Sequence, residues 1–120
     1  MREILFRGKT IDGSGWVTDS ETYIRDADGV WLSDGSAGVV KVVPETVGQF
    51  TGLTDKNGKR IFEGDVVRAI DGALRSVVYV GGAFWTFASD TVYGLMVNWR
   101  GCSGVVGNVH DNPELMGGEE

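Results

Sequence analysis

Short runs of strand-forming residues alternate with turn-forming residues along the whole chain. Apolar positions recur at 4–6, 16–17, 23–24, 30–32 and 39–43, and most of these runs are followed by clusters of Gly, Asp, Ser or Thr. No stretch has the sustained 3.6-residue apolar period of an amphipathic helix. Short apolar runs bounded by turn residues are typical of β-strands, so we predict an all-β chain.

Three dipeptides predict a central antiparallel meander over residues 49–87. They are Asn57-Gly58, Asp71-Gly72 and Gly81-Gly82. Such pairs favour type I′ hairpin turns, because both central residues must accept a positive φ. Centred on these turns, the hairpins would place opposite each other Asp55 and Arg60, Val66 and Val77, and Tyr79 and Phe84. Two further strands are predicted at 95–99 and 105–109.

The end of the chain carries a helix-start signal. Asn112 suits the N-cap, Pro113 the first helical position and Glu114 the first turn. Gly117 follows so closely that only about one turn fits. We therefore predict a small, partly closed β-barrel-like fold with at most short helical turns. A single domain would span residues 1–116, followed by a short acidic tail at 117–120.

Composition narrows the class of protein. Of 120 residues, 19 are glycine, more than twice the usual ~7%, which fits a chain with many tight turns. The single cysteine cannot form an intrachain disulfide. No apolar run approaches the ~18 residues of a membrane-spanning helix, and the N-terminus lacks a signal peptide. We therefore expect a soluble cytoplasmic protein with no membrane contact.

The sequence offers no complete catalytic set. His110 is the only histidine, and neither Ser89 nor Ser103 lies in the G-x-S-x-G motif of a nucleophile elbow. Paired carboxylates could hold a divalent ion or act as acid and base, and the candidates are Asp55, Glu63, Asp65 and Asp111. However, Asp55 lies in a predicted turn, and residues 63–65 are interpreted as a tight connection with solvated acids. We expect no cofactor, no bound metal and no enzyme activity, and a metal-dependent hydrolase is the least favoured alternative.

Aromatic residues provide the other candidate surfaces. Tryptophan is enriched at protein interfaces, and the interface candidates are Trp16, Trp31 and Trp99. Aromatics beside cations could instead stack single-stranded bases, and that candidate face combines Lys56, Arg60, Arg68, Trp85 and Phe87. A net charge of −6, from 17 acids and 11 bases, disfavours contact with a phosphate backbone. Single-stranded nucleic-acid binding is therefore the second hypothesis.

One segment resembles a known family. Residues 43–67, VPETVGQFTGLTDKNGKRIFEGDVV, closely resemble the central block of the YopX family of phage and prophage proteins. Residues 2–9, followed by Trp16-Val17, resemble the family's opening, and residues 106–115 resemble its closing motif. Between 71 and 101 only a loose pattern carries over, and residues 29–38 depart from it. The resemblance implies a small, mostly β fold that forms oligomers in the bacterial host, with no established activity and no catalytic residues.

The YopX-like motifs favour structure over chemistry. We assign a structural role to Pro44, Gly52, Asp55, Asn57, Gly58, Glu63, Gly64, Asp65, Asn112 and Pro113. Turn and backbone-geometry requirements explain these residues without any reaction. The leading hypothesis is a non-catalytic phage or prophage accessory protein in the bacterial cytoplasm. It would form homo-oligomers and bind an unknown phage or host protein.

Overall fold

The fold is all-β, as predicted. The computed structural model describes residues 4–33, 35, 38–68, 74–80, 83–88, 91–95 and 104–116. These residues form β-strands and two short 3-10 helices, with no α-helix among them. The chain divides into two compact units, Met1–Phe50 and Thr51–Glu120, and each is described by itself. The single domain expected over residues 1–116 stays a prediction.

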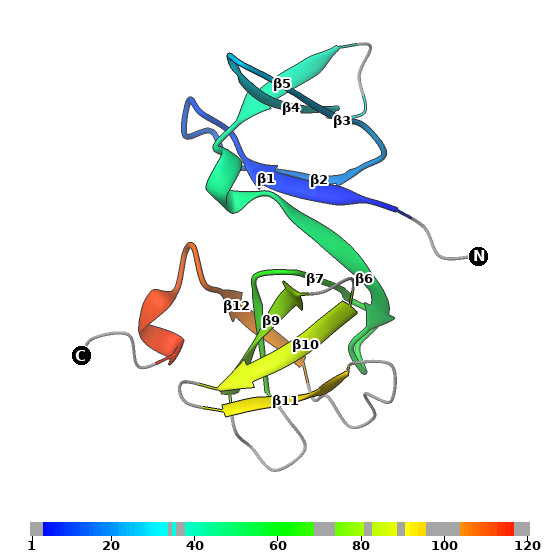
Figure 1. The fold of residues 1–120 in the computed structure, drawn as a ribbon, viewed down its shortest axis with the longest axis vertical. Helices are drawn as coiled ribbons and strands as arrows, with labels where there is room; N and C mark the ends of the chain where they lie inside the picture. Colours follow the sequence, from blue (N-terminus) through cyan, green and yellow to red (C-terminus); the bar gives the residue numbers. More distant parts are fainter. Residues whose placement is uncertain are drawn as a thin grey trace. The chain divides into compact units, whose positions relative to one another are not determined.

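The first unit contains two small antiparallel sheets (Figure 1). Its elements are β1 (Phe6–Lys9), β2 (Trp16–Ser20), β3 (Tyr23–Asp26), β4 (Gly29–Ser33), β5 (Val39–Val42), the 3-10 helix η1 (Pro44–Thr46) and the start of β6 (Gly48–Thr54). The strands β2, β1 and β6 are neighbours in one sheet, and β3, β4 and β5 form the other. An isolated bridge between Thr10 and Val42 joins β5 to the end of β1.

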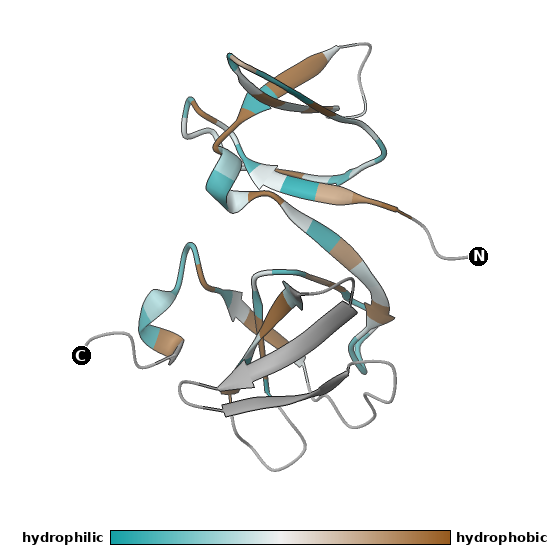
Figure 2. Cartoon of the chain, in the orientation of Figure 1, coloured by the Kyte–Doolittle hydropathy of each residue, from teal (hydrophilic) through white to brown (hydrophobic). Residues whose placement is uncertain are grey.

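Alternation along β4 and β5 builds the core of this unit. Val30 and Leu32 of β4 and Val42 of β5 are at most 1% exposed and pack with Val17 of β2. Successive strand residues point to opposite faces of a sheet, so the residues between them face away from this core. Figure 2 shows that a single hydrophilic position interrupts the otherwise hydrophobic β5. The β3–β4–β5 sheet is therefore apolar on more than its core side.

The second unit contains a five-stranded sheet in the order β11-β10-β9-β8-β12, which curls into a half-barrel (Figure 1). Its elements are the end of β6, then β7 (Arg60–Phe62), β8 (Asp65–Arg68), β9 (Leu74–Val80), β10 (Ala83–Ala88), β11 (Thr91–Leu95), β12 (Gly104–Asn108) and the 3-10 helix η3 (Pro113–Met116). Ile61, Val67 and Val77 form its buried core, with Leu53 and Val105 packed against them. The partly closed β fold is confirmed. The predicted meander over residues 49–87 is confirmed only in part, because β8, β9 and β10 are successive neighbours in this sheet whereas β6 and β7 pair in the other sheet.

The three hairpins follow the predicted order but not all of the predicted registers. The third is confirmed, because Tyr79 lies opposite Phe84. The second is wrong by one residue, because Val66 lies opposite Ser76 rather than Val77. The turn residues of both hairpins lie outside the described residues.

The first hairpin differs in turn type. Asp55 N–H donates to Lys59 C=O at 2.8 Å, and Gly58 N–H donates to Asp55 C=O at 3.0 Å. The loop therefore has three residues, with Gly58 alone in the left-handed region at φ 84°. This is a type I turn followed by a left-handed glycine, not a type I′ turn. Asp55 consequently faces Lys59, and the predicted cross-strand pair with Arg60 is wrong.

The C-terminal elements agree in part with prediction. β12 overlaps the strand expected at 105–109, and η3 begins at Pro113 as a single short turn. β11 spans Thr91–Leu95, and of the strand expected at 95–99, residues 96–99 lie outside the described residues, so that strand stays a prediction. The acidic tail at 117–120 also lies outside them. None of the helices in the described part of the chain is long and apolar enough to cross a membrane.

Candidate functional site

Asp55 uses its carboxylate to fasten the first hairpin to β12. Oδ1 accepts hydrogen bonds from the N–H groups of Asn57 and Lys59, both at 2.9 Å. Oδ2 accepts one from Val105 N–H at 3.0 Å. Burial by itself would raise the pKa of Asp55, but the N–H groups of Val105, Lys59 and Asn57 and the charge of Lys59 together hold it below its ordinary value. Asp55 is thus a structural carboxylate with its acceptor sites directed at backbone.

The segment from Glu63 to Asp65 is a tight connection between β7 and β8. Gly64 has φ 94°, its N–H donates to Val77 C=O, and its C=O accepts from Val109 N–H, both at 2.8 Å. Asp65 is only 1% exposed, and its Oδ2 accepts from Phe62 N–H at 2.8 Å. The expectation of a solvated acid is therefore wrong for Asp65, because the carboxylate closes the turn that leads into β8.

The other motif residues also lie where the backbone changes direction. Pro44 begins η1, and Thr46 closes that turn by donating from Oγ1 to Val43 C=O at 2.6 Å. Gly52 has φ 92° within β6. Asn112 precedes η3 and accepts from Asn108 N–H through Oδ1 at 3.3 Å. None of these contacts presents a reactive group to a substrate.

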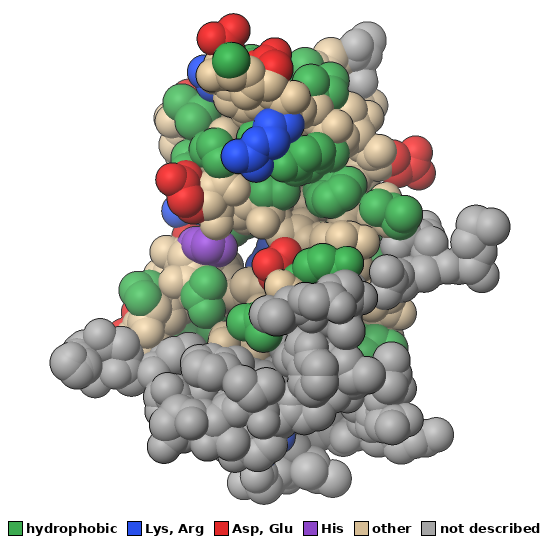
Figure 3. All heavy atoms as spheres, viewed as in Figure 1, with side chains coloured by type: hydrophobic (Ala, Val, Ile, Leu, Met, Phe, Trp, Pro, Cys, Tyr) green, Lys and Arg blue, Asp and Glu red, His purple; other side chains and the backbone are tan. Residues whose placement is uncertain are grey.

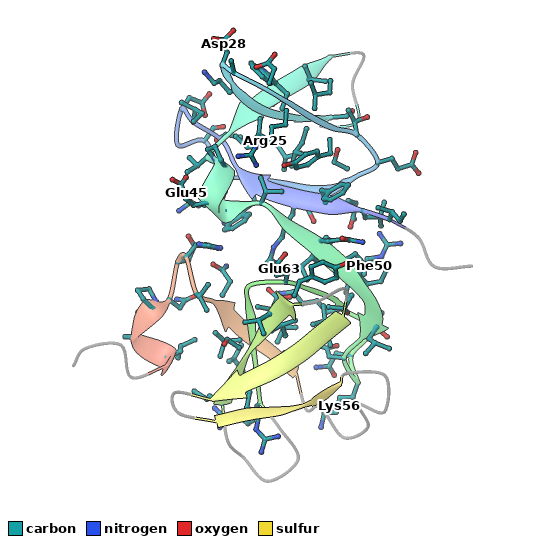
Figure 4. The ribbon with its side chains drawn as sticks, viewed as in Figure 1. Arg25, Asp28, Glu45, Phe50, Lys56 and Glu63 are labelled. Atoms are coloured by element: carbon teal, nitrogen blue, oxygen red, sulfur yellow. The ribbon has the colours of Figure 1, made fainter. Side chains whose placement is uncertain are left out.

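The acidic residues do not assemble a metal centre in the described part of the chain. Asp55 and Asp65 are directed at backbone N–H groups, and Asp111 Oδ2 accepts from Asn108 Nδ2 at 3.3 Å. No group of three or more His, Cys, Asp or Glu side chains suited to a metal ion occurs among the described residues. Glu63 is half-buried and lies on the turn before β8 (Figure 4).

The predicted nucleic-acid face is brought together in part. Lys56 is exposed on the first hairpin loop (Figure 4). Arg68 ends β8 opposite Gly104, and a Cβ on Gly104 would lie 3.7 Å from Asn57 Nδ2. The end of β8 with Arg68 therefore lies near the hairpin loop, and Arg60 begins the strand after that loop. Trp85 and Phe87 belong to β10, and their side chains lie outside the described residues.

Two of the three tryptophans named as interface candidates each lie beside a cation. The guanidinium carbon of Arg7 is 5.0 Å from the Trp16 ring centroid. Lys41 Nζ is 5.6 Å from the Trp31 ring centroid. Both rings are half-buried, and Trp99 lies outside the described residues. Of the two described rings, Trp31 shares a sheet face with the exposed residues Ile24 and Val39.

That surface, called here the outer face, is the side of the β3–β4–β5 sheet turned away from the core. Ile24, Trp31 and Lys41 lie directly across from one another on the three strands. The outer face consists of Ile11, Ile24, Asp26, Gly29, Trp31, Ser33, Val39 and Lys41. Ile24 is 43% exposed, Val39 47% and Ile11 54%. Figure 3 shows several hydrophobic side chains at the surface of this unit.

Three strand edges, those of β2, β12 and β3, are protected against pairing. β2 bulges beside β1, with Asp19 in the left-handed region at φ 60°. β12 has the N–H of Val105 occupied by Asp55. β3 is four residues long and places Arg25 opposite the core residue Val30, on the inward side (Figure 4). Bulges, short strands and inward charges are devices that prevent edge-to-edge association, so the outer face is the better candidate for contact.

A shallow polar depression offers no alternative site. It is lined by Thr18, Asp19, Ser20, Glu21, Thr22, Ser33 and Gly35. Its buried hydroxyl, Ser20 Oγ, donates to Thr22 C=O and accepts from the N–H groups of Thr22 and Ser33, at 2.7 to 3.1 Å. These bonds fix the local backbone, and they fill the hydroxyl's donor and acceptor capacity.

Comparison with known proteins gives the family. No curated protein matches the chain. The crystal structure of protein EF1440 from Enterococcus faecalis is similar, with a TM-score of 0.62 and 23% identity over 97% of this chain and 99% of that one. At this identity the likeness shows the fold alone. The family described as YopX protein matches residues 6–117, nearly the whole sequence. The chain therefore belongs to the YopX family.

Proposed function

We propose that this chain is a non-catalytic protein-interaction module that binds protein through its outer face. The observation that carries the proposal is the composition of that face. An antiparallel sheet with one solvated side ordinarily shows polar residues there. Here Ile24, Trp31 and Val39 occupy those positions while Val30, Leu32 and Val42 fill the core behind them. Apolar surface at water favours association with another apolar surface.

The energetics of the outer face suit a contact surface. Burying a large aliphatic side chain completely is worth about 1.5–3 kcal/mol. Ile24 and Val39 are roughly half exposed, so each would contribute about 1 kcal/mol on contact. Trp31 supplies a rigid aromatic of the kind enriched at the centres of interfaces.

The biological setting of the proposal follows from the family. YopX-like sequences imply a phage or prophage protein in the bacterial cytoplasm, and we propose that setting for this chain. The partners open to the outer face are a second copy of the chain and a phage or host protein. An accessory role of this kind needs no reaction, in keeping with the structural use of Asp55 and Asp65.

A matched capture experiment tests the proposal. Tagged wild-type chain, Ile24→Glu and Val106→Glu would be expressed in bacterial cells with an untagged copy, and bound protein would be identified with and without nuclease. Val106 is the control, because it is 42% exposed on β12, outside the outer face. The wild type and Val106→Glu should capture the same protein in near-stoichiometric amount, with or without nuclease, and Ile24→Glu should lose it. Capture that persists in Ile24→Glu, or that nuclease abolishes, would contradict the proposal.

A further inference from the structure

We propose that the occupant of the outer face is a second copy of this chain, packed face to face with β3 of each copy over β5 of the other. The inference rests on the proposed function and names its partner. It comes from the placement of two opposite charges on the outer face, Lys41 on β5 and Asp26 on β3.

The Lys41 side chain runs along the surface of the sheet toward the level of Asp26. A Cβ built on Gly29 would lie 2.6 Å from Lys41 Cε, so the lysine stem crosses directly above Gly29. Gly29 is the residue opposite Asp26. The ammonium group therefore reaches the level of Asp26 along the strands, with Trp31 at its side.

Neither charge is neutralised within the part of the chain that the structure describes. The Lys41 ammonium contacts the Trp31 ring and makes no ion pair there. Asp26 Oδ1 accepts from Asp28 N–H at 2.7 Å, and no described cation pairs with its carboxylate. The outer face thus offers a positive group on one outside strand and a negative group on the other.

This arrangement is self-complementary under one rotation. A twofold axis parallel to the strands, lying between two stacked sheets, keeps positions along the strands and exchanges β3 with β5. Lys41 of each copy then faces Asp26 of the other, and the Trp31 rings approach at the centre. Stacked sheets lie about 10 Å apart, so the Lys41 side chain would turn from its own sheet toward the second copy to reach Asp26. An axis across the strands would instead bring Lys41 toward Lys41 of the second copy and away from Asp26.

The same rotation also brings apolar side chains to the contact. Because it keeps positions along the strands, Ile24 on β3 faces the β5 side of the other copy at the level of Lys41, two residues from Val39. Because the contact is isologous, it closes at two copies and buries each outer face once. An unrelated partner would have to supply both the charge pattern and the apolar positions independently, whereas a second copy supplies both by symmetry.

A charge-swap experiment tests the second-copy contact. Sedimentation equilibrium would compare the full chain with Lys41→Asp, Asp26→Lys and the double variant Lys41→Asp/Asp26→Lys. We expect a wild-type dimer, a dissociation constant raised roughly tenfold or more in each single variant, and recovery to within about threefold in the double variant. Ile24→Glu should be monomeric, and Val106→Glu should dimerise as the wild type does. All of these positions are exposed, and circular dichroism would verify that each variant folds.

Several results would overturn the inference. The wild-type chain could stay monomeric at high micromolar concentration, or the dimer could survive Ile24→Glu. The double variant could also dimerise as weakly as the single variants, with no recovery of the dissociation constant. Failure of the inference is distinguishable from failure of the proposed function. A monomeric chain that captures a different protein through Ile24 would remove the second copy and leave the interaction module standing.

Discussion

At the scale of single residues, Asp55 links distant parts of the second unit. Its carboxylate joins the hairpin between β6 and β7 to Val105, 50 positions further along the chain. The side chain is buried, and both of its carboxylate oxygens accept hydrogen bonds from backbone N–H groups. A buried N–H that loses its acceptor destabilises the fold by about 1–3 kcal/mol, so this residue matters to folding rather than to chemistry.

The pH dependence of stability should reveal Asp55. Its pKa is lowered in the folded protein, so its stabilising contribution is present above the unfolded pKa of about 3.9 and is lost as pH falls through the folded pKa. Urea unfolding between pH 6 and pH 3 should show a smaller loss of stability for Asp55→Asn than for the wild type. Asp28→Asn, at an exposed loop position, should keep the full wild-type acid dependence. An unchanged slope in Asp55→Asn would contradict the role given to this carboxylate.

Gly107 is a second residue whose identity the structure requires. A Cβ there would lie 2.6 Å from Asn112 Oδ1 and 2.9 Å from Leu115 Cδ1. Gly107→Ala should therefore destabilise the protein by about 1–3 kcal/mol, because the turn before η3 must shift. Gly38→Ala is the matched control, since nothing lies within 4 Å of its Cβ position. Equal urea midpoints for the two variants would show that the turn yields without strain.

At the scale of elements, the sequence predicts strands better than it predicts their pairing. Short apolar runs located most strands, because burial in a sheet demands them. The Asn57-Gly58 signal located the first hairpin but suits two loop lengths. The side chain of Asp55 favours the three-residue loop, because it accepts hydrogen bonds from the N–H groups of Asn57 and Lys59. That choice shifts the pairing by one residue and removes the expected pair with Arg60.

The candidate surface was predictable only in part, for a related reason. Trp31 stands out by residue type, but so do Trp16 and Trp99. Which of them joins an exposed apolar face depends on the pairing of β3, β4 and β5, and on the residues that alternate inward. Ile11 reaches the outer face because the end of β1 pairs with β5, where Ile11 N–H donates to Lys41 C=O, 30 positions away by their numbers, at 3.1 Å. Composition and spacing carry no signal for that contact.

Substitutions in the first hairpin distinguish its loop from a type I′ turn. Only Gly58 has a positive φ in this loop, so Gly58→Ala should destabilise the protein by about 1–2 kcal/mol. Asn57→Ala should change stability much less, because Asn57 lies outside the left-handed region. In a type I′ turn both residues would need positive φ. Comparable losses for both variants in urea unfolding would therefore contradict the three-residue loop.

At the scale of the whole molecule, the balance of charge favours a protein partner. The chain carries 17 acids and 11 bases, a net charge of −6. Binding to a phosphate backbone depends on cations that release counterions. The candidate nucleic-acid face has only three cations to offer, Lys56, Arg60 and Arg68. On the outer face, the cation Lys41 is accompanied by the acid Asp26. Apolar contact at the outer face does not depend on this net charge. In the proposed dimer, Lys41 of each copy would neutralise the charge of Asp26 of the other.

Titration with a fluorescent single-stranded oligonucleotide at low salt should therefore give no saturable binding tighter than roughly 10⁻⁴ M. The nucleic-acid hypothesis expects the opposite result. Binding that weakens with added salt, and that weakens further in Arg68→Glu, would support that hypothesis and count against a purely protein-binding role.

Photo-cross-linking from the outer face tests the central claim most directly. A benzophenone-bearing residue would replace Ile24 in one sample and Val106 in another, in cells that express the full chain, and the mass of each adduct would identify the contact. Position 24 should form an adduct with a protein, and position 106 should not. An adduct with twice the mass of the chain would identify a second copy, and another mass would identify a different protein. No protein adduct from position 24, or equal adducts from both positions, would contradict the outer face as the binding surface.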